Sequence, residues 1–307
     1  MSTFILTKIC TILIFQLLLP CRKEPTLTTP LQQYEHHTAL RRDPLCPFKL
    51  HRSVALNNTI CNWHKNIEIL LVTDGSGWVQ YDAVELPVEN GDIVIVNSGA
   101  LHRPHSETGI SFYCLIIDDS FCRENGLGAE KRRFCPILRD AATEELFRSA
   151  ANAISKYQLE GTAISAAKAR GAVLSLLINI CENHSDNSLD GEESAKRSER
   201  YVKRALEYLG EHYAEPIRLE SLAGMLGITK FHLSREFKRY TGQTVFTYIN
   251  TVRCKNAELC IANGLSVTEA AYGCGFESLS YFSRTYKRLM GKPPSSKNTK
   301  PKPISNK

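Results

Sequence analysis

Three residues of metal-binding type lie in the first third of the chain. His64 and Glu68 are four residues apart, and His102 follows a turn with the sequence Asn97-Ser98-Gly99. Two imidazoles and one carboxylate can hold a first-row divalent metal ion on one face of the ion. The same groups can instead be hydrogen-bonded polar residues that line the pocket of a ligand-binding barrel. The residue types leave both interpretations open.

A second set of candidate residues is basic and occurs twice in the last third of the chain. Ser234-Arg235, Lys238-Arg239 and Gly242 recur 49 residues later as Ser283-Arg284, Lys287-Arg288 and Gly291. Leu219, Leu222, Ala223 and Gly227 recur 48 residues later as Val267, Ala270, Ala271 and Gly275. Such a repeat indicates one structural unit used twice. Each copy has the pattern helix, glycine-containing turn and basic helix, which is typical of a helix-turn-helix.

Apolar residues spaced four apart give each basic helix an inner face. Leu233 and Phe237, and their repeat partners Phe282 and Tyr286, should point into the core. The opposite face is left for DNA, where Arg can pair with guanine and aromatic rings can contact thymine methyl groups. Basic residues at the helix ends are expected to hold phosphates. The predicted phosphate contacts are Lys230, Lys238, Arg239, Lys287 and Arg288.

The charge distribution supports a polyanionic partner for the C-terminal part. The 307-residue chain carries a net charge of +6, but residues 200–307 hold 18 Lys and Arg against 8 Asp and Glu, a net charge of +10. Residues 1–199 sum to −4. Charge concentrated in one domain points to a polyanion such as nucleic acid. The 11 cysteines form no Cys-x-x-Cys pair, which favours reduced thiols over disulfides or a zinc site.

The elements that must position these residues fall into two domains. Short β-branched runs separated by turn signals, one of them Asp74-Gly75-Ser76-Gly77, predict a small barrel or jelly roll over residues 48–121. Helical periodicity over 140–157 and 163–181 predicts two antiparallel helices, with one face on the barrel and the other available to a partner chain. A polar stretch over 185–199 predicts a flexible linker, and residues 295–307 a basic disordered tail.

The N-terminal 30 residues fit this organisation poorly. Phe4–Leu19 is mostly apolar, but its uninterrupted run is shorter than the about 20 residues that a spanning helix requires. We expect that the biological chain starts near Leu27–Tyr34 and that residues 1–30 are an over-extended start. A membrane anchor remains the alternative.

Two segments of the barrel region resemble the cupin motifs. The first is Asn62-x-His64-x3-Glu68-x6-Gly75, and the second is Gly91-x5-Asn97-x-Gly99-x2-His102. Asn62 stands at the position of the first motif's first His, and Asn97 at that of a Pro. The resemblance implies a cupin-like domain over 31–184. In cupin enzymes these positions bind metal, whereas the missing His favours a sensor barrel without one.

Residues 200–294 resemble the DNA-binding domain of the AraC/XylS family of transcription regulators. The motifs that carry the resemblance are Leu222-Ala223, Phe237-Lys238, Gly242, Tyr248, Arg253, Ala257, Ala270-Ala271, Gly275-Phe276, Tyr281-Phe282-Ser283-Arg284, Gly291 and Pro294. Many members carry an N-terminal cupin-like sensor domain, so the order of the whole chain fits. The positions that contact bases in the family correspond to Phe231, Ser234, Arg235, Ser280, Tyr281 and Arg284.

The resemblance implies a two-domain protein, an all-β barrel with two accessory helices followed by an all-α domain of two helix-turn-helix units. It implies a cytoplasmic regulator, more often an activator in this family, that is not an enzyme and uses no cofactor. Its expected partners are double-stranded DNA, RNA polymerase, a second copy bound through helices 140–157 and 163–181, and a small-molecule effector, for which a sugar is one candidate. The expected effector pocket consists of His64, Glu68, Trp78, His102 and Arg103.

Two alternatives remain from the sequence. One is a metal-dependent cupin enzyme with a helical extension, which would use His64, Glu68 and His102. The other is a regulator tethered to a membrane through Phe4–Leu19.

Overall fold

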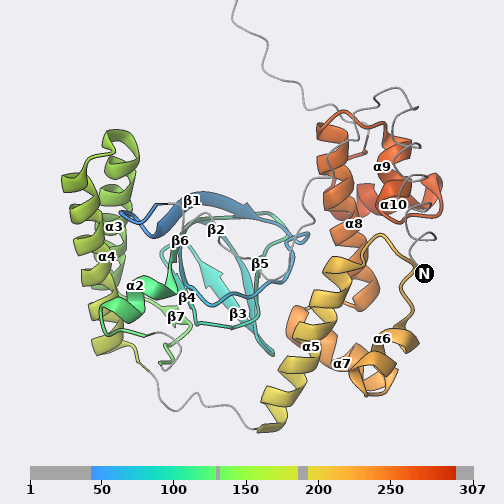
Figure 1. The fold of residues 1–307 in the computed structure, drawn as a ribbon, viewed down its shortest axis with the longest axis horizontal. Coiled ribbons are helices and arrows are strands. Elements are labelled where there is room, and N and C mark those ends of the chain that lie inside the picture. Colours follow the sequence, from blue (N-terminus) through green and yellow to red (C-terminus); the bar gives the residue numbers. More distant parts are fainter. Residues whose placement is uncertain (1–42, 129–131, 186–192, 295–307) are drawn as a thin grey trace, which may run out of the picture.

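The computed structural model describes residues 43–128, 132–185 and 193–294. The predicted N-terminal extension 1–30 and the predicted tail 295–307 lie outside these residues. Within them, a β domain flanked by helices on one side meets a separate group of helices on the other (Figure 1).

The β domain is an antiparallel barrel built around one long strand. The strands are β1 (Phe48–Ala55), β2 (Ile67–Tyr81), β3 (Val84–Glu89), β4 (Ile93–Val96), β5 (His102–His105), β6 (Ile110–Ile117) and β7 (Ile137–Leu138). One sheet has the order β1-β6-β2-β4-β7. The second half of β2 pairs with β3 and β5 instead. Because β2 belongs to both sheets, it closes them into the predicted cupin-like architecture.

The sequence predicted a turn at Asp74-Gly75-Ser76-Gly77, and the structure corrects this. These residues lie inside β2, where the register against β6 shifts between Val72 and Asp74. A Cβ on Gly75, which has φ +81°, would lie 2.6 Å from the carbonyl oxygen of Gly109. The glycine therefore permits a close approach of two backbones at a bulge in the strand rather than a reversal of the chain.

Alternation along the strands divides the apolar residues of the barrel between two cores. One core fills the interior, with Leu70, Val72, Val94, Val96, Cys114 and Ile116 among its members. The other lies between the outer face of the sheet and helices α2 (Asp119–Glu124), α3 (Ala141–Glu160) and α4 (Ala163–Asn183). Within the described part of the chain, α4 alone is long and apolar enough to span a membrane, and its buried residues pack in this second core.

The C-terminal domain contains both predicted helix-turn-helix units. Its helices are α5 (Glu193–Glu211), α6 (Leu219–Leu226), α7 (Lys230–Thr241), α8 (Val245–Ala262), α9 (Val267–Gly273) and α10 (Leu279–Met290). Helix α5 begins seven residues before Arg200, the predicted start of the DNA-binding domain, so residues 193–199 of the expected linker are helical. The first unit, unit 1, is α6–α7, and unit 2 is α9–α10; α8 connects them.

The two units have matching helix ends, as the repeat predicts. Thr229 caps the N-terminus of α7 and Ser278 that of α10, each by accepting a backbone N–H three residues later. Gly242 and Gly291 end these helices in the left-handed conformation. One apolar core runs through both units and includes the predicted inner residues Leu233, Phe237, Phe282 and Tyr286.

The barrel joins that core on the side of unit 1. Cys61, Trp63 and Leu101 of the barrel are buried in the same apolar cluster as α5 and α7. Lys203 on α5 donates from Nζ to the carbonyl oxygen of Gly99 at 2.6 Å. In Figure 1 the barrel wall that contains β3 and β5 faces α5 and α7, on the side opposite α3 and α4.

Candidate nucleic-acid interface and sensor site

Both recognition helices, α7 and α10, present the predicted DNA-facing residues at the surface. All six expected base-contacting side chains are exposed: Phe231, Ser234, Arg235, Ser280, Tyr281 and Arg284. The expected phosphate contacts Lys238, Arg239, Lys287 and Arg288 are also exposed, and Lys230 is partly exposed. Phe231 is 77% exposed although it is a large apolar residue, so its side chain contributes little to the apolar core.

In unit 1, intramolecular ion pairs involve several of the basic residues. Lys230 Nζ lies 2.7 Å from Glu220 Oε1 on α6. Glu236 is buried, and its carboxylate contacts Arg235 at 3.0 Å and Arg239 at 3.4 Å. These bonds orient the guanidinium groups along the outer face of α7, with most of the Arg235 side chain still exposed.

In unit 2, the basic side chains are less engaged. Among the described residues, no ion pair involves Arg284, Lys287 or Arg288. Besides its buried apolar residues, α10 contacts the connector through Tyr281, whose hydroxyl accepts a hydrogen bond from Asn250 Nδ2 of α8 at 3.0 Å. Tyr281 nevertheless remains 45% exposed at the start of α10.

The connector α8 fixes the two units relative to each other. Arg253 donates from Nε to the carbonyl oxygen of Tyr213 at 2.6 Å, and from Nη2 to that of Glu215 at 2.7 Å. The same loop lies against the turn of unit 2, since a Cβ on Gly275 would lie 2.5 Å from the carbonyl oxygen of Ala214. The loop that joins the units therefore packs on Arg253 of the connector and on Gly275 of the turn in unit 2.

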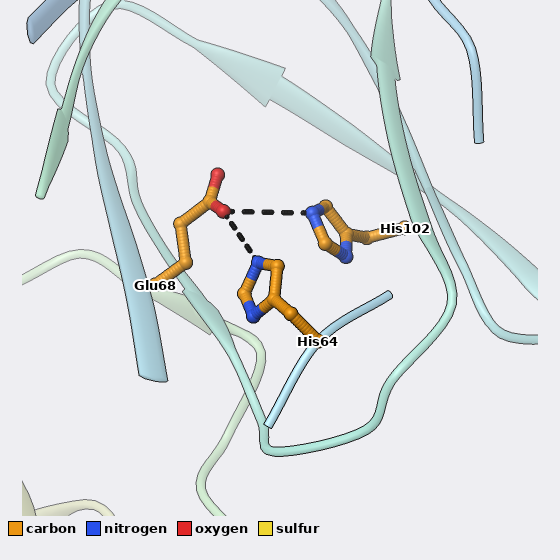
Figure 2. Close-up of side chains that lie close together, drawn as sticks. All are labelled: His64, Glu68 and His102. Carbon is orange, nitrogen blue, oxygen red and sulfur yellow. Dashed lines mark hydrogen bonds and ion pairs between the residues drawn. The ribbon is translucent and has the colours of Figure 1, made fainter. Parts of the chain in front are cut away.

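Inside the barrel, His64, Glu68 and His102 come together (Figure 2). Glu68 Oε2 lies 2.8 Å from His64 Nε2 and 3.6 Å from His102 Nε2. All three residues are buried, and their potential ligand atoms lie within 4.8 Å of one another. The structure thus brings three of the five expected pocket residues together in one cluster.

The hydrogen bonds of the two imidazoles determine what this cluster can hold. His64 Nδ1 lies 3.0 Å from the carbonyl oxygen of Asn66, and His102 Nδ1 lies 3.1 Å from that of Ala100. A carbonyl only accepts, so each Nδ1 carries a proton and a neutral ring would direct the lone pair of Nε2 toward Glu68. When Glu68 is ionised, the cluster therefore favours positive charge between its rings and the carboxylate, as protons on the imidazoles or as a metal ion.

The electrostatics of Glu68 agree with this preference. Burial alone would raise the pKa of its carboxyl group. Hydrogen bonds from His102 and His64 outweigh burial and hold the pKa of Glu68 well below its usual value. Glu68 is a carboxylate at neutral pH, as a metal ligand must be.

Asn62, which departs from the first cupin motif, supplies a fourth polar group. Its backbone pairs with that of His102 in an antiparallel bridge, which places the two side chains on the same face of the barrel wall. Within the described residues, Asn62 Oδ1 is buried without a hydrogen-bond partner. An amide oxygen at this position fits the donor set of a divalent ion.

Trp78 and Arg103 do not belong to this cluster, which corrects the predicted pocket. Side chains alternate across a strand. Val79 and His102 point into the barrel, and Trp78 and Arg103 point out of it. Trp78 lines a surface groove of about 530 Å³ with Pro87 and Arg139, among others.

Arg103 contacts the DNA-binding domain instead of an effector pocket. It is buried, and burial lowers the pKa of its guanidinium group. Its Nε donates to the carbonyl oxygen of Thr241, near the end of α7, at 3.1 Å. Gln80, two positions from Trp78 on β2, similarly donates from Nε2 to the carbonyl oxygen of Arg239 at 3.0 Å. No sequence pattern marks Gln80, because only the pairing of β2 with β5 brings it beside Arg103.

Two family models match this chain, and together they cover both domains. An AraC-like ligand-binding domain matches residues 54–177, and a helix-turn-helix domain matches residues 222–298. The chain belongs to the AraC family of transcriptional regulators.

Proteins similar to this AraC-family regulator are also named as HTH-type transcriptional regulators or activators. The uncharacterized HTH-type transcriptional regulator YdeC of Bacillus subtilis is 26% identical over 273 residues, which cover 85% of this chain and 92% of that protein. The HTH-type transcriptional activator RhaS of Salmonella schwarzengrund is 33% identical over 97 residues, 31% of this chain and 35% of RhaS. Among solved structures, ToxT of Vibrio cholerae aligns with a TM-score of 0.41 and 16% identity, covering 81% of this chain and 96% of that chain.

Proposed function

We propose that this AraC-family regulator reads one asymmetric DNA site with two different recognition helices. The observation that carries the proposal is that all six expected base-contacting side chains are exposed near the starts of α7 and α10, while the opposite faces of both helices are buried. N-terminal residues of a recognition helix are the ones that reach base edges. Because the residues of the two helices differ, the two half-sites should differ.

A pair of substitutions on α10 tests this assignment. Arg284→Ala should weaken specific binding by about 1–3 kcal/mol and relax the base preference at one position. Lys287→Ala should weaken binding to all sequences alike and flatten its salt dependence. Binding titrations on the selected site and on random DNA measure both. An equal loss on specific and random DNA for both variants would contradict the assignment.

We further propose that an effector binds inside the barrel at His64, Glu68 and His102, and that the protein regulates transcription without acting as an enzyme. Among the described residues, His64, Glu68 and His102 form a buried polar cluster beside the apolar interior core, and a carboxylate between two imidazoles attracts positive charge. This favours a small cationic effector over the sugar that was one candidate from the sequence. A divalent transition-metal ion fits two Nε2 atoms, one carboxylate and the buried amide oxygen of Asn62.

Metal binding is tested on the full chain without a histidine tag. We expect one Zn²⁺ per chain by isothermal titration, a higher melting temperature with Zn²⁺ and no such effect of Mg²⁺, because imidazole ligands select against magnesium. Glu68→Gln should abolish the effect. Glu85→Gln is the matched control, because Glu85 contacts the single imidazole of His105 at 2.9 Å near the surface. Absence of Zn²⁺ binding would remove both the metal effector and the metal-dependent enzyme alternative.

The remaining expectations concern partners and location. We propose that the protein is a cytoplasmic activator that acts with RNA polymerase; the name of RhaS supports activation. We also propose a homodimer through α3 and α4, because Leu159 and Ile164 at their junction are 89% and 71% exposed. Sedimentation of the wild type and of Leu159→Asp with Ile164→Asp measures this. A monomeric wild type would contradict the dimer.

A further inference from the structure

The end of recognition helix α7 is held by the barrel. The last carbonyl groups of a helix have no partner within the helix. In α7, the carbonyl of Arg239 accepts from Gln80 Nε2 at 3.0 Å and that of Thr241 accepts from Arg103 Nε at 3.1 Å. Arg103 also places a positive charge at the negative end of the helix dipole. Gln80 and Arg103, which we call the clamp residues, come from paired positions of β2 and β5.

The repeat provides an internal control for this contact. Gly242 and Gly291 end α7 and α10 in the same conformation, with φ +70° and +73°. A Cβ on Gly242 would lie 2.7 Å from Arg103 Nη2 and 3.1 Å from Gln80 Oε1, whereas a Cβ on Gly291 has nothing described within 4 Å. Gln80 and Arg103 therefore close on one copy of a duplicated helix end. The end of α10 meets the β domain differently, through Asn58 Nδ2, which lies 3.6 Å from Met290 Sδ.

Gln80 and Arg103 lie on the outer face of the barrel wall, and His102 of the metal-binding-type cluster lies on its inner face. Arg103 follows His102 directly, and Gln80 precedes Tyr81, which pairs with His102. Because neighbours in a strand point to opposite faces, a shift of β5 that repositions His102 in the barrel also moves Arg103 against α7. The other inner residues share this wall, since Asn62 pairs with His102 while Cys61 and Trp63 face the DNA-binding domain.

The clamp leaves the DNA-reading end of α7 open. Its 12 residues span about 18 Å. The clamp holds one end, and Phe231 and Ser234 are exposed near the other. The contact therefore controls the orientation of α7 without covering the residues expected to read bases.

We infer that Arg103 and Gln80 are positioning residues that set the orientation of α7, and that they transmit the state of the His64–Glu68–His102 cluster to unit 1 while unit 2 is left unaffected. This inference rests on the proposed function, because it assigns the regulation of the same sensor site. It makes the barrel a selective regulator of one half-site.

The experiment selects binding sites from random DNA with the full chain and compares base preferences in the two half-sites. Arg103→Met should reduce discrimination in the unit 1 half-site by about three- to tenfold and leave the unit 2 half-site unchanged. Gln80→Leu should act in the same direction. Gly242→Ala should also affect the unit 1 half-site, whereas its matched control Gly291→Ala should not. Melting curves verify that each variant is folded, and Arg103→Lys, which keeps the charge, gives an intermediate effect.

Transmission from the cluster is measured by a double-mutant cycle on DNA affinity. Glu68→Gln changes the inner face, and Arg103→Met removes the clamp on the outer face. We expect the effect of Glu68→Gln to shrink by about three- to tenfold when Arg103 is already Met, because the two residues then act through one contact. Additive effects of the two substitutions would overturn the transmission.

The outcomes separate the two levels of the proposal. If the wild type selects no DNA sequence, the proposed function fails. If the wild type selects an asymmetric site and Arg103→Met selects the same site with the same discrimination, the proposed function stands and this inference is overturned.

Discussion

The two helix-turn-helix units have the same local design and different surroundings. Both begin their recognition helix with a hydroxyl cap and end it with a left-handed glycine. Unit 1 has ion pairs through Glu220 and Glu236, and the barrel holds its end. In unit 2, Tyr281 bonds to the connector and the arginines stay outside any described ion pair. A duplicated sequence thus yields one unit positioned by the sensor and one positioned by the connector.

The largest expected effects test whether the units share one core. Phe237→Ala and Phe282→Ala remove fully buried rings, one from each unit. Each should lower the free energy of unfolding by about 3–5 kcal/mol. Since both rings belong to one apolar cluster, we expect either substitution to shift a single transition of the C-terminal domain. Calorimetry that resolved separate transitions for the units would contradict a shared core.

The turn glycines should differ although they are repeat partners. Gly227 and Gly275 have φ +70° and +85°, so alanine at either costs about 1–2 kcal/mol. A Cβ on Gly275 would also meet the backbone of Ala214 at 2.5 Å, which adds about 1–3 kcal/mol, while Gly227 has open space in the described structure. Denaturant titration of Gly227→Ala and Gly275→Ala measures the difference. Equal losses in the free energy of unfolding would show that the loop at Ala214 moves aside for the added Cβ at no cost.

Substitutions of the repeat partners Arg235 and Arg284 should both weaken DNA binding but should differ in their effect on stability. Arg284→Ala should weaken DNA binding without changing the free energy of unfolding. Arg235→Ala removes a partner of the buried Glu236, so it should weaken binding and also destabilise the fold by about 0.5–1.5 kcal/mol. Melting curves and DNA titrations of both variants check this. The prediction would be contradicted if Arg284→Ala lost stability and Arg235→Ala did not.

The smallest effect concerns the ion pair that only unit 1 contains. Lys230 contacts Glu220, and the matching positions of unit 2 are Leu279 and Thr268. Hydrogen bonding from Lys230 lowers the pKa of Glu220, so the carboxylate is charged at neutral pH. Glu220→Gln should release Lys230 for DNA and strengthen binding by about two- to threefold at low salt, an effect lost as salt rises. Unchanged affinity at low salt would exclude Lys230 as a phosphate contact.

Local patterns in the sequence predicted most of the secondary structure and the exposure of both sets of residues expected to face DNA. Apolar residues at period 3.6, hydroxyl caps and repeated glycines depend on neighbours along the chain, so they are readable without tertiary contacts. The prediction failed where tertiary contacts decide. Gly75 looked like a turn residue but serves a close approach inside β2, and the predicted linker residues 193–199 extend α5.

The sequence by itself determined that the chain has two helix-turn-helix units, a barrel, and a possible group of His64, Glu68 and His102. Only the tertiary structure decided that Trp78 and Arg103 face away from that group. The reason is strand alternation combined with pairing: which face a side chain occupies depends on where the bulge in β2 falls and on which strands pair across it. The same pairing joins Arg103 to the end of α7, a contact across 138 residues of sequence that no local pattern encodes.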